Sequence, residues 1–236
     1  MTGINQLDLC RAYLRSATGS DRTGNPIKKP VGPVVTISRE AGARGNSIAE
    51  DLLARLQAIQ TIPRRHPWTL FNQNLIQCII DDHAMPQSSA DYLREDGVRD
   101  ISFMVAEMLG LHPGVYNSVR RTAETIRRIA LAGNAVIVGR GGNVITADIG
   151  HSLHVRLVGS LEVRTGHYAK RFQLSENKAA AEVARIDRAR KRYLKTHYRA
   201  DVADPLRYDS VINTDRLDNA GAAEVIVTAL AARCAD

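Results

Sequence analysis

A turn between a predicted strand and a predicted helix carries the residue types that bind phosphate groups. The strand is predicted at Pro33–Ser38, the turn follows as Arg39–Asn46, and apolar residues at helical spacing run from Ser47 to Leu56. Backbone N–H groups at the start of such a helix are unpaired, and the helix dipole favours an anion there. Glycines within the turn allow the backbone to wrap closely around phosphate oxygens. An ordinary connection between strand and helix is the alternative, because the turn lacks the lysine of the GxxxxGK[ST] motif.

A second glycine-rich turn, Gly139–Gly142, follows the predicted strand Asn134–Val138 and contains Arg140. Ligands of open parallel sheets bind at the carboxyl ends of the strands. A guanidinium at that edge can donate two parallel hydrogen bonds to a phosphate group. The alternative is a surface arginine in a turn, but the presence of the first turn favours a binding role.

The segment Arg185–Arg192 is dense in cations and is predicted to be helical. On a helix, Asp187 and Arg190 have the i, i+3 spacing of an ion pair. Phosphate groups need several convergent cations, which this segment can supply, although a run of charge is usually a solvated helix face. A nucleic-acid-binding surface is a further alternative. Because Tyr193 and Tyr198 are the only aromatic residues nearby, platforms for base stacking are sparse and nucleic-acid binding is not expected.

Strands that alternate with helices must position these segments. Besides the two strands above, His154–Val158 and Ser210–Asn213 have the apolar, β-branched composition of strands. The segment 68–133 is predicted to be mostly helical, and further helices are predicted over 161–198 and 219–232. This alternation is typical of an α/β fold in which helices cover both faces of a parallel sheet.

The composition indicates an anionic partner and no membrane segment. The formal net charge is +7 at pH 7, which favours phosphorylated ligands or nucleic acid. No apolar run reaches the roughly 18 residues of a membrane-spanning helix, and the N-terminus lacks a signal peptide, so a cytoplasmic location is expected. The three cysteines show no CxxC spacing, which argues against a disulfide framework and a zinc site. Residues 1–32 are predicted to be a flexible extension, and residues 33–236 a single domain.

Six segments, in order along the chain, resemble segments of one known family. Thr36–Ala49 is similar to an opening signature, roughly ISREYGSGGREIA, that itself lacks the lysine, and Ala135–Gly142 is similar to a VIVGRG segment. These are segments of the cytidylate kinase-like family, which the chain resembles from about residue 34 to 232. The other four similar segments are Trp68–Leu75, Leu157–Arg164, Ile186–Tyr193 and Leu206–Thr214.

This resemblance implies a P-loop NTP hydrolase-type fold: three layers, α/β/α, around a parallel sheet, with helical insertions. One insertion, 68–132, would bind the nucleoside monophosphate, and the other, 161–200, would be a basic lid. The implied reaction transfers the γ-phosphoryl group of ATP, with Mg²⁺, to a nucleoside monophosphate or a similar small phosphorylated acceptor. Such a reaction depends on positioning and charge neutralisation more than on covalent chemistry.

The resemblance also implies roles for single residues. The donor phosphates would be bound by the turn, through Gly42, Ala43, Gly45, Asn46 and Ser47. Ser47 would also supply a hydroxyl to the magnesium ion. The acceptor would be held by Arg140, Asp187 and Arg190, and the lid would contribute Arg164 and Arg171 to catalysis. We hypothesise that Arg39 and Arg44, which lie in the turn, replace the missing lysine.

Two departures from the family pattern leave a second function open. Asn72 stands where the family commonly has aspartate, and Gly141 stands where cytidylate kinases have an aspartate after the arginine. Few carboxylates therefore remain to organise magnesium or to recognise a cytosine. The alternative to a kinase is a nucleotide-binding sensor or regulator that has lost turnover. A nucleic-acid-binding module is a weaker alternative.

Overall fold

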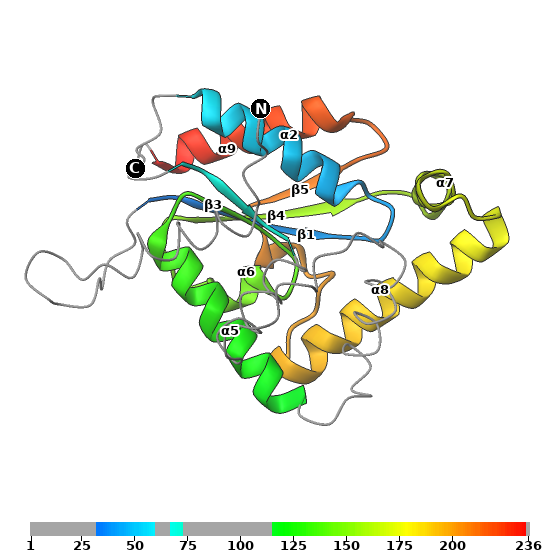
Figure 1. The fold of residues 1–236 in the computed structure, drawn as a ribbon, viewed down its shortest axis with the longest axis horizontal. Coiled ribbons are helices and arrows are strands. Elements are labelled where there is room, and N and C mark those ends of the chain that lie inside the picture. The colour runs from blue at the N-terminus through cyan, green and yellow to red at the C-terminus, as the bar shows by residue number, and fades with distance from the viewer. Residues whose placement is uncertain (1–31, 60–66, 73–114, 235–236) are drawn as a thin grey trace, which may run out of the picture.

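The computed structural model describes residues 32–59, 67–72 and 115–234 (Figure 1). Within them, five strands form one sheet in the order β2-β3-β1-β4-β5, and every neighbouring pair is parallel. The strands are β1 (Val34–Arg39), β2 (Thr69–Phe71), β3 (Ala135–Val138), β4 (Ser152–Val158) and β5 (Ser210–Asn213). Because parallel strands end at the same edge of a sheet, the turns that follow β1 and β3 emerge side by side.

The central strands are apolar because both faces of the sheet are covered. All of β3 is buried, and so are the first four residues of β1. Ile37 of β1 is opposite Val138 of β3, and the Gly139 N–H donates to the Ile37 carbonyl at 3.0 Å. This register brings the end of β1, at Arg39, next to the start of the second glycine-rich turn.

Helices on both faces of the sheet complete three layers (Figure 1). On one face, α2 (Gly45–Ala58) and α9 (Asn219–Cys234) pack over the larger apolar core. On the other face, α5 (Val115–Ala132) and the short α6 (Gly142–Ile145) pack over a second core. The predicted fold class, a three-layer α/β/α domain with a parallel sheet, is confirmed.

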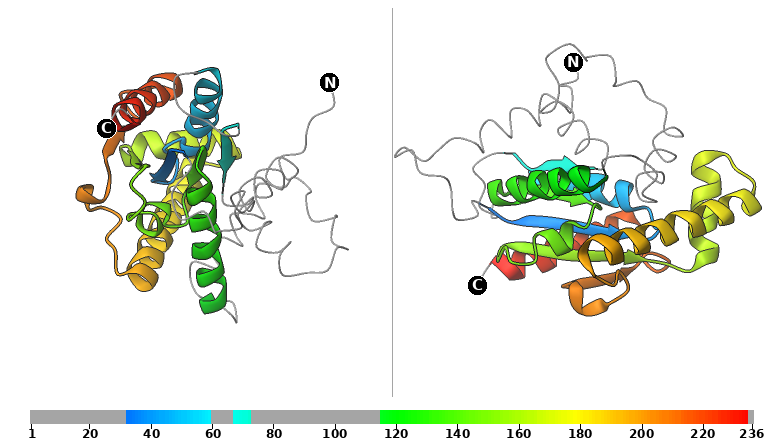
Figure 2. Two further views of the ribbon diagram at one scale, coloured as in Figure 1. Left: turned by 90° about the vertical axis from the view of Figure 1, so that its left-hand side faces the viewer. Right: turned by 90° about the horizontal axis from the view of Figure 1, so that it is seen from below.

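Two helices after β4 project past the sheet (Figure 2). α7 (Leu161–Phe172) begins at Ser160, whose side chain accepts a hydrogen bond from a backbone N–H of the first turn. α8 (Glu176–Tyr198) then returns toward α5, so that α7 and α8 form an arm. The helical structure predicted over 161–198 is confirmed, but as two helices, because Gln173 adopts a φ of 52° and ends the first.

The four predicted strands are present, whereas β2 was not predicted. The sequence predicts 68–133 to be mostly helical, yet β2 occupies part of that segment and follows Trp68, which is buried in the core. A three-residue strand is too short to display a period of two.

The helix predicted at 122–131 lies within α5. The helical stretches predicted near 75–80 and 101–109, and the extension up to residue 31, lie outside the described residues. In the described part of the chain, no helix is both long and apolar enough to cross a membrane.

Candidate functional site

A pocket opens at the carboxyl ends of β1 and β3, where the two glycine-rich turns meet α8. Strand β1 contributes Thr36–Arg39, the second turn with the start of α6 contributes Gly139–Asn143, and α8 contributes Arg190 and Tyr193. The pocket thus combines segments more than 150 residues apart in the sequence. Three arginines from three elements line it, those at positions 39, 140 and 190.

The Arg39 guanidinium lies at the centre of this arginine cluster. Burial lowers the pKa of Arg39 well below its ordinary value, and the positive charges of Arg190 and Arg140 lower it further, while Asp187 opposes them. Among the described residues, the Arg39 guanidinium donates no hydrogen bond. Arg140 is buried and Arg39 and Arg190 are half-buried, and cations held close together away from water are stabilised by an anion between them, so the cluster has the electrostatics of an anion site.

The turn after β3 is shaped to admit the Arg39 side chain. A β-carbon added at Gly139 would lie 2.0 Å from Arg39 Nη1, so glycine leaves room for the guanidinium in its present position. Gly139, Arg140 and Gly141 have φ values of 85°, 53° and 73°, in the left-handed region. This backbone turns sharply and holds the Arg140 side chain inside the protein, where it is 4% exposed.

Arg190 approaches the pocket from α8. Its Nη1 donates to the Arg39 carbonyl oxygen at 3.2 Å and lies 4.0 Å from Asp187 Oδ1, so the predicted i, i+3 pair is present. Burial lowers the pKa of Arg190, and Asp187 partly offsets this effect. The Arg190 Nε is buried and has no hydrogen-bond partner in the described structure. A ligand oxygen could accept this hydrogen bond.

The turn after β1 presents unpaired backbone donors at the start of α2. The Ala41 N–H donates to Asp187 Oδ1 at 2.8 Å, and the Ala43 N–H donates to the Glu40 carbonyl oxygen at 3.3 Å. The next donor in the helical ladder is the Ile48 N–H, which bonds the Arg44 carbonyl oxygen. Within the described residues, no hydrogen bond is donated by the backbone N–H groups of Gly42, Arg44, Gly45, Asn46 and Ser47. Such donors at a helix start form an anion site.

The Arg44 side chain points away from the pocket. Its guanidinium donates to the carbonyl oxygens of Thr214 and Leu217, at 2.5 and 2.6 Å, and to Asn219 Oδ1 at 2.9 Å. Arg44 therefore connects the turn to the start of α9. In this geometry Arg39, rather than Arg44, brings positive charge to the pocket.

Comparison with known proteins identifies the family. A model of the cytidylate kinase-like family matches residues 34–216. The chain belongs to this family. A relative described as a cytidylate kinase, from Methanothrix thermoacetophila, is 32% identical over 107 residues, which are 45% of this chain and 60% of that protein. The match therefore spans less than two thirds of the relative. The crystal structure of an uncharacterized protein from Eubacterium ventriosum superimposes with a TM-score of 0.63 at 20% identity, covering 85% of this chain and 99% of that one, which shows a shared fold.

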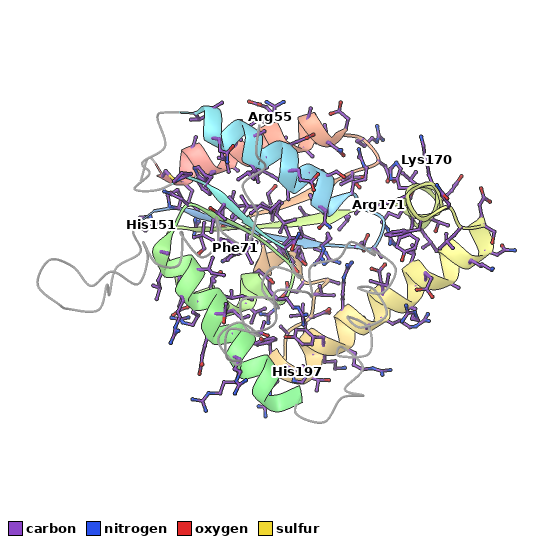
Figure 3. All side chains as sticks on the ribbon, viewed as in Figure 1. Arg55, Phe71, His151, Lys170, Arg171 and His197 are labelled. Carbon is purple, nitrogen blue, oxygen red and sulfur yellow. The ribbon has the colours of Figure 1, made fainter. Side chains whose placement is uncertain are left out.

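The residues that the cytidylate kinase-like resemblance assigns to the lid lie in two different settings. Arg164 is 7% exposed and is surrounded by the turn after β1 and by α8. Arg171 is exposed on α7, where its guanidinium lies 5.8 Å from the Phe172 ring, next to Lys170 on the arm (Figure 3). The structure thus separates the two arginines, and neither lines the pocket.

A magnesium ion would find one of its expected ligands at the start of α2. Ser47 is partly exposed in the first helical turn, beside the unpaired N–H groups. In the described structure no three histidine, cysteine, aspartate or glutamate side chains cluster as a metal site. A cation here would consequently depend on the Ser47 hydroxyl, on phosphate oxygens and on water.

Asn143 and Thr36 are among the pocket residues that were not identified from the sequence. Asn143, at 5% exposure, has a buried Nδ2 without a partner among the described residues. The Thr36 hydroxyl pairs with His154 Nδ1 at 2.8 Å across β1 and β4. Asn143 follows Arg140 by three residues, so its proximity to a glycine-rich turn was the available signal. No sequence signal pairs Thr36 with His154, because that contact depends on the strand order.

Proposed function

We propose that this protein transfers the γ-phosphoryl group of ATP to a small phosphorylated acceptor, with a nucleoside monophosphate such as cytidine monophosphate as the first candidate. Membership of the cytidylate kinase-like family supports a nucleotide kinase-like function. The name of the 32% identical relative supports cytidylate as the acceptor to test first. Because the match covers only 60% of that relative, the proposed reaction and acceptor site are argued from the geometry of the pocket.

The observation that carries the proposal is the convergence of Arg39, Arg140 and Arg190 beside the turn that begins α2. A phosphomonoester at neutral pH carries close to two negative charges and accepts several hydrogen bonds. Guanidiniums from three elements of the fold match that charge and can bond its oxygens with paired donors. We assign this pocket to the phosphate group of the acceptor.

The turn at 42–47 is suited to the donor. Its unpaired N–H groups and the positive end of the α2 dipole would bind the phosphates of ATP. A magnesium ion, held in part by Ser47, would neutralise charge on those phosphates. An acceptor phosphate oxygen would then form a bond to the γ-phosphorus as the bond to the β,γ-bridging oxygen breaks, which leaves ADP. Positioning and charge stabilisation supply the catalysis, so no general base is required.

A second candidate function is nucleotide binding without turnover. The observation in its favour is that Arg44, one of the two cations of the turn, is engaged with the segment before α9. The turn also has no lysine. In that case the pocket would sense phosphorylated ligands rather than process them.

Phosphoryl transfer measured across a panel of nucleoside monophosphates, together with calorimetric binding of each nucleotide, distinguishes the two functions. The proposal predicts that ADP and a nucleoside diphosphate form in equal amounts, and that Arg140→Ala removes most of this activity. Micromolar nucleotide binding without product from any acceptor would favour the sensor. Activity that survives Arg140→Ala unchanged would contradict the assignment of the pocket.

A further inference from the structure

We infer that Glu40, Arg164 and Asp187 form a clamp that holds the phosphate-binding turn in its shape, and that Arg164 and Asp187 are positioning residues. This inference rests on the proposed function insofar as the turn binds ATP. The clamp lies behind the turn, between the first helical turn of α7 and the middle of α8. It assigns Arg164 and Asp187 roles different from the lid and acceptor-binding roles that the family resemblance implies.

Arg164 is anchored on several sides. Its Nε donates to the Gly159 carbonyl oxygen at 2.9 Å and pairs with Glu40 Oε2 at 3.2 Å. Its Nη1 donates to the Ala41 carbonyl oxygen and to Asp187 Oδ2, both at 2.8 Å. Arg164 is 7% exposed, and these contacts fix its guanidinium in place, unlike an arginine that travels with a lid to a phosphoryl group.

Both carboxylate oxygens of Asp187 are occupied. Oδ1 accepts from the Ala41 N–H at 2.8 Å, and Oδ2 accepts from Arg164 at 2.8 Å. One turn further along α8, Arg190 donates to the Arg39 carbonyl oxygen. Helix α8 is therefore hydrogen-bonded to the backbone on both sides of Glu40. The same helix also carries Arg190, one of the three arginines of the acceptor pocket.

Glu40 connects the clamp to β4. Its Oε2 accepts from the Gly159 N–H at 3.1 Å, and its Oε1 lies 3.5 Å from Arg156 Nη2. The turn also lies directly against α7, because a β-carbon at Gly42 would lie 2.1 Å from the Arg164 carbonyl oxygen. These contacts fix the backbone from which the unpaired N–H groups of residues 42 and 44–47 project.

The clamp predicts that donor binding depends on side chains that do not touch the donor. Asp187→Asn preserves the shape of the side chain and can still accept from Ala41, but it removes the charge that pairs with Arg164. Arg164→Lys keeps the charge but loses the planar fork that bonds Gly159, Ala41 and Asp187 together. Each change should loosen the turn and weaken ATP binding by roughly tenfold or more.

The test combines amide hydrogen exchange over residues 39–48 with calorimetric titration by ATP, on the full chain. Glu182→Gln is the matched control, because it removes a partly exposed ion pair with Arg185 on the same helix, away from the turn. We expect Asp187→Asn and Arg164→Lys to exchange the Ala41 amide, which donates to Asp187 in the wild type, at least about tenfold faster than the wild type. We expect the same two variants to bind ATP more weakly, and the control to match the wild type in both measurements.

Unchanged exchange at Ala41 in both variants overturns the clamp, whether or not the protein binds ATP. Faster exchange with unchanged ATP affinity also overturns it as a positioning device for the donor. If the wild type does not bind ATP, the proposed function fails, and hydrogen exchange alone decides whether the clamp holds the turn. An Arg164→Lys effect confined to kcat, with normal exchange and normal ATP affinity, would restore the lid role.

Discussion

Replacing Arg39 by methionine should have opposite effects on the free protein and on its complex with an acceptor. In the free protein Arg39 is half-buried, faces the charges of Arg140 and Arg190, and its guanidinium donates no hydrogen bond within the described structure. Methionine retains apolar volume and removes the repulsion. The free energy of unfolding without ligand should therefore stay within about 1 kcal/mol of the wild type or rise.

The same change should abolish most of the stabilisation that cytidine monophosphate gives. A hydrogen bond to a charged group is worth about 1.5–3 kcal/mol, which is roughly ten- to hundredfold in Kd. At a ligand concentration of about 100 times Kd, the wild type gains about 2.7 kcal/mol of unfolding free energy, and a hundredfold weaker variant gains about 0.4 kcal/mol.

Urea unfolding with and without the nucleotide measures both quantities. Arg120→Met, which removes a surface pair with Glu124, is the control and should retain the full ligand effect. A variant that loses more than about 2 kcal/mol without ligand but keeps its ligand stabilisation would refute the anion site at Arg39.

Three further predictions concern the surroundings of the site. Gly42→Ala should lower the unfolding free energy by about 2 kcal/mol or more, because φ is 80° and the added carbon would meet a backbone oxygen at 2.1 Å. Gly166→Ala, with open space around it on α7, should raise the unfolding free energy by about 0.5–1 kcal/mol in the same urea assay; equal effects would contradict the packing of the turn. Burial lowers the folded-state pKa of His154 below its ordinary value of 6.5, so the unfolded chain binds the proton more readily and stability should fall as pH drops below about 6.5. His154→Asn should flatten that decline between pH 7.5 and 5.5 in calorimetric melts, and an unchanged slope would exclude this histidine as its cause. Arg44→Ala should lower the unfolding free energy by about 2 kcal/mol, since it leaves the carbonyls before α9 unpaired, and a change under about 0.5 kcal/mol would contradict that structural role.

The sheet was predictable because its central strands are short apolar runs bounded by glycine. Short buried runs such as Val34–Ile37 and Ala135–Val138 are typical of central strands of a parallel sheet, and few other elements have this pattern. Because these strands alternate with helices, the sheet is expected to be parallel. The short strand β2 could not be predicted, because three residues carry too little pattern. Its place at the sheet edge beside β3 is set by tertiary pairing.

The candidate site was predictable at the level of segments but not of individual side chains. The glycines and arginines of both turns indicated anion binding, and the strand register brings those turns together. The orientation of each arginine could not be derived from the sequence. Arg39 and Arg44 are five positions apart in one turn, yet one enters the pocket and the other bonds the segment before α9. That difference depends on the left-handed conformation of Arg44, which starts α2, and on contacts with residues about 170 positions away.

Transfer of labelled γ-phosphoryl from ATP to cytidine monophosphate, with KM determined separately for donor and acceptor, tests the central claim most directly. The proposed site predicts labelled cytidine diphosphate with the wild type. It also predicts that Arg39→Met raises the acceptor KM by roughly tenfold or more while the ATP KM stays within about twofold. A rise confined to the ATP KM would contradict the assignment of the arginine pocket to the acceptor. The absence of labelled product from every nucleoside monophosphate, in a protein that binds ATP, would contradict the kinase function itself.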